Sequence, residues 1–175
     1  MDIFPISLKL QQQPCLIVGG GHIAYRKAVL LQKAGAVISV ISPEILPELL
    51  EIVEQSQGQY VRSNFHHEIN IRVYRLVIAA TDDKPTNQNV FHVCELENVL
   101  VNSVDDPPHC RFMVPAIIDR SPLVVSIATN GQSPVLSRQI RTQLEAAIPH
   151  EMGRLAEFSG KWRSAVKAKI VNPDE

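Results

Sequence analysis

A glycine-rich turn near the start of the chain carries the clearest chemical signal in the sequence. Gly19, Gly21 and Ala24 follow a short apolar run with the spacing G-x-G-x-x-G/A, in which alanine takes the last small position. In this pattern the first glycine allows a tight turn, the second lets backbone approach a pyrophosphate, and the last residue lets a helix pack against a strand. The first N–H groups of that helix then face the phosphates. We expect a bound dinucleotide, with a plain tight turn as the alternative. The expected contacts are Gly19, Gly21, His22 and Ile23.

The residues after the second apolar run bear on which dinucleotide is bound. An acidic residue near the end of the second strand ordinarily accepts hydrogen bonds from the ribose hydroxyls. Here Ser42 and Pro43 come first, so the acid is displaced to Glu44, and Ser42 is expected to share its role. No lysine or arginine occurs between Lys33 and Arg62, so nothing nearby in the sequence neutralises the extra phosphate of NADP. The sequence therefore favours NAD, with Ser42, Pro43 and Glu44 at the ribose.

Two later polar residues follow apolar runs, where ligands bind in open parallel sheets. Thr81 follows the run 76–80, and its position predicts a cofactor contact or, alternatively, a helix cap. Asp105 is the first polar residue past the run 100–104, which makes it the candidate acid/base. The alternative is that Asp105 caps a turn before two prolines.

Histidine and cysteine spacing predicts no permanent metal site. The three cysteines are Cys15, Cys94 and Cys110, an odd number without C-x-x-C spacing, which is typical of free thiols in a reducing cytoplasm. His92 and Cys94 do not match a structural zinc pattern. The net charge of -1 gives no indication of nucleic-acid binding, and no apolar run reaches the length of a membrane span.

Strands and helices alternate over residues 1–112, which predicts a Rossmann-like, doubly wound parallel sheet in an α/β domain. The expected strands are residues 5–10, 15–18, 37–41, 59–65, 76–80 and 100–104. The expected helices are residues 22–34, 43–55 and 83–97, the last capped by Asp82 or Asp83.

The pattern changes beyond residue 112 and predicts a small α+β dimerisation domain over 113–149, followed by a short helical tail over 150–175. The expected elements are strands 112–118 and 123–128 and helices 133–148 and 151–170, with Ser133 as a cap and Pro134 in the first turn. So few elements cannot bury a good core alone, so this part must pack on the first domain or on a second subunit. A homodimer is therefore expected.

Five stretches make the chain similar to a known family. They are residues 15–28, 79–83, 102–105, 112–123 and 130–141, the last two being the most specific: FMVPAIIDRSPL and NGQSPVLSRQIR. The chain resembles the precorrin-2 dehydrogenase/ferrochelatase module of the sirohaem synthase family. The resemblance implies a Rossmann domain, an intertwined homodimer, and NAD-dependent oxidation of precorrin-2 to sirohydrochlorin. It also implies that Asp105 is the essential aspartate and that ferrous iron is a second substrate in several members.

The resemblance leaves some expectations open. The chain ends at residue 175 without the methyltransferase domain of some members, so it is expected not to make precorrin-2 itself, and its short tail leaves iron insertion undecided. The substrate is rich in carboxylates, which gives Arg120 or Arg138 a use as a contact. Two other interpretations remain: a regulatory nucleotide-binding domain, and a sensor that binds NAD without catalysis.

Overall fold

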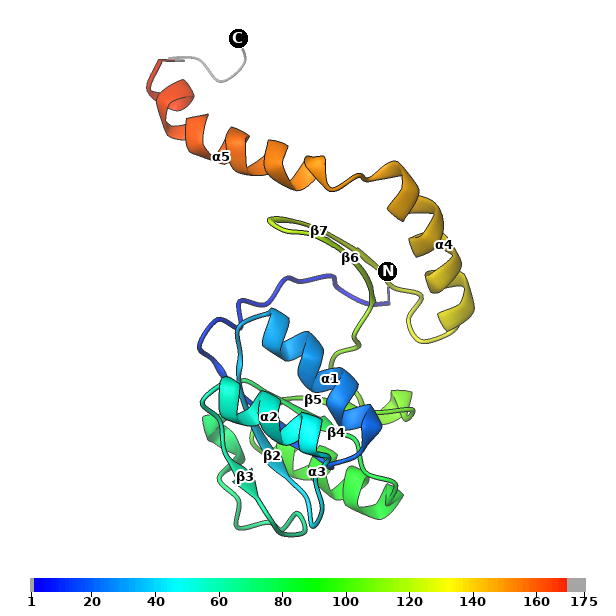
Figure 1. The fold of residues 1–175 in the computed structure, drawn as a ribbon. Coiled ribbons are helices and arrows are strands. Elements are labelled where there is room, and N and C mark those ends of the chain that lie inside the picture. Colours follow the sequence, from blue (N-terminus) through cyan, green and yellow to red (C-terminus); the bar gives the residue numbers. More distant parts are fainter. Residues whose placement is uncertain (1, 170–175) are drawn as a thin grey trace. The chain divides into compact units, whose positions relative to one another are not determined.

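A five-stranded parallel sheet forms the centre of the first part of the chain (Figure 1). The computed structural model describes residues 2–169, which divide into two units, one over residues 3–113 and the other from residue 114 onward. In the first unit the strands are β1 (Pro14–Val18), β2 (Val37–Ile41), β3 (Tyr60–Val61), β4 (Leu76–Ala79) and β5 (Leu100–Ser103). Their order is β3-β2-β1-β4-β5, and every neighbouring pair is parallel. The predicted Rossmann-like sheet is confirmed.

Helices cover both faces of this sheet and give it two separate apolar cores. The helices are α1 (His22–Lys33), α2 (Pro47–Gln55) and α3 (Lys84–Leu96), with short 3₁₀ turns η1 (Ile71–Val73) and η2 (Pro107–His109). Cys15 and Ile17 of β1 pack with α1 and α2, whereas Leu16 and Val18 pack with α3. Because successive side chains of a strand point to opposite faces, a strand buried on both sides is apolar throughout. Residues 15–18 are all apolar because β1 is buried on both faces of the sheet.

The strand order reverses between β1 and β4, and this reversal decides where a ligand can bind. β2 lies on one side of β1 and β4 on the other, so the connections from the two central strands run in opposite directions. In open sheets of this kind a crevice forms beyond the carboxyl ends of those strands. The glycine turn follows β1, and Thr81 follows β4.

Several expected boundaries are wrong. Residues 5–10 form no strand, although their polar and apolar residues alternate. The β-turn after Leu10 is instead bonded to the loop between α1 and β2, through Gln12 N–H to the Gly35 carbonyl at 2.7 Å, and 5–10 join neither edge of the sheet. The third strand is only Tyr60–Val61, because β2 pairs with just these two residues.

The other differences concern where elements begin. The second helix begins at Pro47 rather than residue 43, since Leu46 is its extended N-cap residue. The first hairpin strand is Ala116–Arg120, set by pairing with residues Leu123–Ile127. Asp83, not Asp82, caps α3, and its carboxylate accepts a hydrogen bond from Thr86 N–H at 2.9 Å.

The second unit contains a hairpin and two helices. They are β6 (Ala116–Arg120), β7 (Leu123–Ile127), α4 (Pro134–Ala147) and α5 (Glu151–Lys169); Ile170, expected in the last helix, lies outside the described residues. Ser133 caps α4, and Pro134 lies in its first turn, as predicted. Only Ile118, Ser137 and Gly153 are buried among the described residues of this unit. Burial of so few side chains gives it little core of its own.

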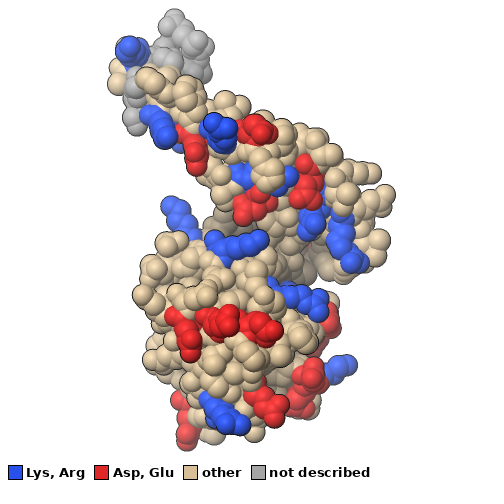
Figure 2. Space-filling view, in the orientation of Figure 1, with Lys and Arg blue, Asp and Glu red and all other residues tan. Residues whose placement is uncertain are grey.

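Acidic and basic residues are interspersed on the visible face of each unit (Figure 2). This agrees with the nearly balanced composition of 17 Lys and Arg against 18 Asp and Glu. In the part of the chain that is described, no helix is both long and apolar enough to cross a membrane.

Two buried thiols make the stability of the first unit depend on alkaline pH. Burial raises the pKa of Cys15 from 9.0 to about 11 and that of Cys94 from 9.0 to about 12. Between pH 9 and these values the unfolded chain loses both thiol protons while the folded chain keeps them. The free energy of unfolding must therefore fall as the pH rises above 9. We expect a smaller fall in a C15A/C94A double variant, measured by urea unfolding at about pH 7, 9 and 10.5. Equal pH dependence of the two proteins would contradict this assignment.

Candidate functional site

A cleft of about 600 Å³ opens at the carboxyl ends of β1, β2 and β4. Its walls come from the glycine turn, the loop between β2 and α2, residues 63–65 after β3, and residues 80–83 after β4. All eight residues expected to contact a cofactor line this cleft: Gly19, Gly21, His22, Ile23, Ser42, Pro43, Glu44 and Thr81. Residues that are up to 62 positions apart are thus brought to one surface by the sheet.

The three consecutive glycines have different neighbours. Gly19 has a φ of +122°, and a Cβ there would collide with the Ala80 carbonyl at the end of β4. A Cβ on Gly20 would collide with the Glu44 carbonyl, whereas one on Gly21 would meet nothing within 4 Å. Gly19 and Gly20 are therefore required for the fold itself. Gly21 is open, which leaves space for a ligand to approach the start of α1 closely.

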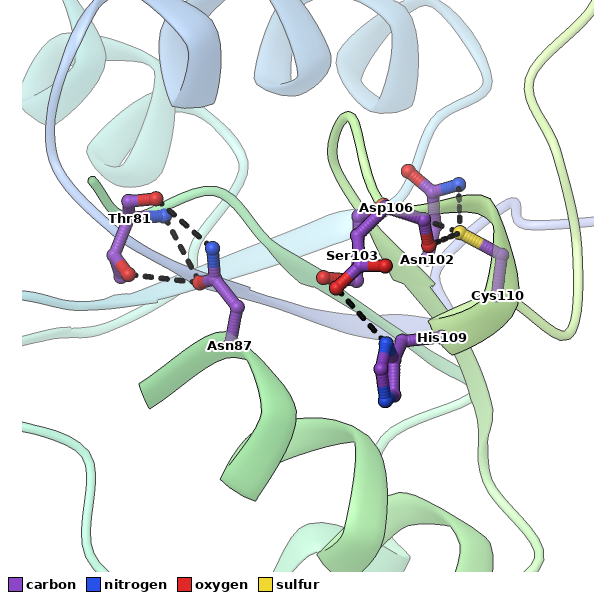
Figure 3. Close-up of polar contacts among 7 residues, drawn as sticks. All are labelled: Thr81, Asn87, Asn102, Ser103, Asp106, His109 and Cys110. Carbon is purple, nitrogen blue, oxygen red and sulfur yellow. Dashed lines mark hydrogen bonds and ion pairs between the residues drawn. The ribbon is translucent and has the colours of Figure 1, made fainter. Parts of the chain in front are cut away.

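Thr81 is held rigidly at the rim of the cleft by Asn87, a residue of α3 that sequence reasoning missed. Its hydroxyl donates to Asn87 Oδ1 at 2.7 Å, and the Asn87 amide nitrogen donates to the Thr81 carbonyl at 2.9 Å (Figure 3). Asn87 is buried. Because Asp83 provides the side chain that caps α3, Thr81 is not that cap. Asn87 lies on the same face of α3 as Val90 and Cys94. A polar residue on this otherwise apolar helix face was the one feature of the sequence that could have pointed to it.

Arg62 is also near the cleft, although it lies far from β2 in the sequence. Its Nε donates to the Pro43 carbonyl at 3.1 Å, and Tyr60 donates its hydroxyl hydrogen to the Ser42 carbonyl at 3.0 Å. The parallel pairing of β2 with β3 causes this proximity. A cationic side chain therefore lies beside Pro43, a residue that lines the cleft.

Asp105 occupies an exposed turn directly after β5 and is not among the residues that line the cleft. Its φ of +58° places it in the left-handed region, so it also shapes the turn. Lys27 of α1 is near enough to interact with it. Burial lowers the pKa of Lys27, while the Asp105 carboxylate and then Cys110 oppose this decrease. A partly buried ammonium group therefore lies near the Asp105 carboxylate.

Polar contacts of Asn102, Cys110 and the Asp106–His109 pair hold the segment after β5, which contains Asp105, in place (Figure 3). The Cys110 thiol donates to the Ser103 carbonyl at 3.1 Å, and Asn102 Nδ2 donates to the Phe112 carbonyl at 2.9 Å. Asp106 pairs with His109 across η2 at 2.9 Å, as expected for a residue that shapes the turn. These contacts join the segment after β5 back to the strand, so the turn that carries Asp105 is anchored to β5.

Arg120 and Arg138, the two residues expected to contact substrate carboxylates, differ in how many of their N–H donors are free. Arg120 donates from Nε to the Ile148 carbonyl at 3.0 Å and lies 3.9 Å from Glu145, with a side chain only 9% exposed. Arg138 is exposed and makes one weak bond, at 3.4 Å, to the Pro134 carbonyl. Arg120 is thus used inside the second unit, and Arg138 is the better candidate. Among the described residues, no group of three His, Cys, Asp or Glu side chains could hold a metal ion.

The fold and the cleft together define a dinucleotide-binding protein of the Rossmann type. Residues 6–116 match a family model described as "Putative NAD(P)-binding", and residues 120–147 match one described as "Sirohaem biosynthesis protein central". The first model covers more than half of the chain, so the chain belongs to this NAD(P)-binding family. The resemblance to the sirohaem synthase family is confirmed.

Relatives and solved structures agree with this assignment. The chain is 67% identical to a siroheme synthase of Acinetobacter baylyi over 176 residues and 46% identical to a siroheme synthase of Chromobacterium violaceum over 174 residues. These matches cover 100% and 99% of this chain but only 38% and 37% of the relatives, so it spans just over a third of their length. The solved structure titled "SirC, precorrin-2 dehydrogenase" superposes with a TM-score of 0.79 at 25% identity, covering 98% of this chain and 84% of that one.

The different surroundings of the glycines predict opposite effects of alanine. We expect G19A to reduce the free energy of unfolding by about 2 kcal/mol or more, because of its positive φ and the Ala80 carbonyl. We expect G21A to remain within about 1 kcal/mol of the parent protein and yet to bind NAD about tenfold or more weakly, because its methyl group occupies the approach to α1. Urea unfolding and calorimetric titration with NAD measure the two effects. A G21A protein with unchanged NAD affinity would place the pyrophosphate elsewhere.

Proposed function

We propose that this chain is an NAD-dependent dehydrogenase that oxidises precorrin-2 to sirohydrochlorin. The observation that carries this proposal is the superposition on the structure titled a precorrin-2 dehydrogenase, which extends over both units. The two siroheme synthases that resemble the whole chain support the same pathway. The cleft, framed by the glycine turn, supports use of a dinucleotide.

The residues of the cleft fit NAD. The open space at Gly21 admits a pyrophosphate to the first N–H groups of α1, and Glu44 offers a carboxylate to the ribose hydroxyls. Gly19, His22 and Ile23 lie on the pyrophosphate side of the cleft in this proposal. Ser42 and Pro43 lie on the ribose side, and Thr81 contacts the cofactor from the end of β4. When bound, NAD supplies an acceptor for the hydride that leaves the substrate. The chain itself orients the cofactor and shields one face of it.

Asp105 supplies the acid/base chemistry in this proposal. Oxidation of a carbon–carbon bond in the macrocycle removes a hydride and also a proton, and the Asp105 carboxylate accepts the proton. Lys27 is the basic group of α1 that interacts with this carboxylate. A positioned base contributes about 10²–10⁴-fold to the rate. Insertion of ferrous iron, as a second substrate, would also displace pyrrole protons and would use the same carboxylate.

The second unit provides a homodimer interface in this proposal, and the protein acts in the cytoplasm. The unit buries little by itself and exposes many large apolar side chains: Val124, Val135, Leu136, Met152, Leu155, Phe158, Trp162 and Val166. Surface of this kind is covered in stable proteins by a partner. The three unpaired thiols support a reducing compartment.

An anaerobic assay with precorrin-2 and NAD tests the activity. We expect sirohydrochlorin and NADH to form, and we expect kcat/KM to fall about 10²–10⁴-fold in D105A because the proton acceptor is lost. The matched control is D106N, which alters the neighbouring carboxylate that pairs with His109. Adding ferrous iron tests insertion in the same reaction.

Three results would count against these assignments. A folded D105A protein with full turnover removes Asp105 from the mechanism. NAD binding without turnover in the parent protein supports the sensor interpretation instead. Equal losses in D105A and D106N would point to the turn rather than the carboxylate of Asp105.

Light scattering tests the dimer. We expect a mass of twice 19.5 kDa at micromolar concentration, and a shift toward the monomer in F158D/W162D, since two charges then replace apolar surface on α5. L96D is the control, because Leu96 is an 81% exposed apolar residue of the first unit. A monomeric parent protein would remove the dimer proposal.

A further inference from the structure

The end of β2 lacks the acid that ordinarily selects NAD. The nearest acid, Glu44, lies in the loop after β2, and the basic residue Arg62 lies beside the same loop. The first residue past β2 is Ser42, which is buried and neutral, and the acid follows two residues later at Glu44, which is exposed. In this fold an acid at the ribose favours NAD, and an arginine nearby accommodates the 2′-phosphate of NADP. Both kinds of residue are present here.

Arg62 is held at this place by the sheet. β3 lies beside β2 in the sheet (Figure 1), with Val40 paired to Tyr60 and Ile41 paired to Val61. Arg62 follows the last paired residue, and its contact with Pro43 places it beside the loop after β2. Its Nε donates to the Pro43 carbonyl at 3.1 Å. One backbone bond therefore orients the guanidinium at a residue that lines the cleft.

The remaining donors of Arg62 are free for a ligand. A guanidinium has five N–H donors and binds phosphate oxygens in pairs. Only the Nε hydrogen has a partner in the described part of the chain, where no carboxylate lies within 4.0 Å of Arg62. Ser63 and Asn64, the next two residues, line the cleft and add short polar side chains beside it. Together they form a cationic, hydrogen-bonding rim around the ribose position.

We propose that the ribose end of this cleft binds NADP as well as NAD, with Arg62 as the residue that contacts the 2′-phosphate. The inference rests on the proposed dinucleotide site and deepens it. Glu44 serves the free ribose hydroxyls of NAD, and Arg62 offsets the repulsion between Glu44 and the phosphate of NADP. Arg62 thus determines the ratio of the two affinities.

Calorimetric titration with NAD and with NADP tests this without turnover. We expect the parent protein to bind NADP within about tenfold of NAD, and we expect the ratio of the NADP to the NAD dissociation constant to rise about tenfold in R62Q. Glutamine can still donate to the Pro43 carbonyl, so the loop is retained while the charge is lost. R62K keeps the charge and should retain most of the NADP affinity.

The matched control is R75Q. Arg75 is an exposed arginine of the same unit that precedes β4, at the opposite end of the strand from Thr81. We expect R75Q to have the same ratio of NADP to NAD dissociation constants as the parent protein. Raising the salt concentration from about 0.05 to 0.3 M should weaken NADP binding more than NAD binding, and this difference should shrink in R62Q.

The outcomes separate this inference from the proposed function. An NADP affinity more than about a hundredfold below that of NAD, or a ratio unchanged in R62Q, overturns the role of Arg62 and leaves the dehydrogenase intact. Tight binding of both dinucleotides with no oxidation of precorrin-2 overturns the dehydrogenase and leaves the role of Arg62 intact. Failure of both dinucleotides to bind overturns both.

Discussion

The close backbone approach between the glycine turn and its two neighbours is the constraint on which the cleft depends. Gly19 N–H donates to the Ile41 carbonyl of β2 at 2.9 Å, and Ala80 N–H donates to the Val18 carbonyl at 2.8 Å. The Leu46 N–H donates to the Gly20 carbonyl at 3.0 Å. These bonds join the ends of three strands into one rigid rim, and no side chain larger than hydrogen fits at Gly19 or Gly20 without moving backbone. The cleft is therefore formed before any ligand arrives, which lowers the ordering cost of binding.

Polar residues beyond the strands are kept in position by partners that come from elsewhere in the chain. Asn87 holds Thr81, and the Cys110 and Asn102 side chains hold the segment that follows β5. Two buried side-chain oxygens, Asn102 Oδ1 and Ser103 Oγ, have no hydrogen-bond partner in the part of the chain that is described. Asp105 itself is left exposed on a turn with fixed backbone. Such an arrangement leaves the carboxylate accessible from solvent while its main chain stays rigid.

The two units differ in how they achieve stability. The first has two apolar cores, one on each face of a sheet whose central strand is buried on both sides. The second buries three described residues and exposes many large apolar ones. By the scaling of surface with size, a unit of this length gains little from its own core. The proposed dimer would cover that surface, and Gly153, which leaves no room for a Cβ beside the Arg120 carbonyl, shows how closely α5 packs on the hairpin within the unit.

The sequence by itself determined the features that depend on neighbours in the chain. The apolar runs, the G-x-G-x-x-A spacing, the cap at Ser133 and Pro134 after it are local, so the fold class and eight of the residues that line the cleft followed from pattern alone. The choice between Asp82 and Asp83 as the cap of α3 did not. Only the tertiary structure decided which strands pair. It left residues 5–10 outside the sheet, shortened β3 to two residues, and brought Asn87 to Thr81 and Arg62 to Pro43. No basic residue lies between Lys33 and Arg62 in the sequence, yet Arg62 lies close to Pro43 in space. This proximity depends on the pairing of β2 with β3. No local pattern encodes that pairing, because its free energy comes from contacts between segments far apart in the chain.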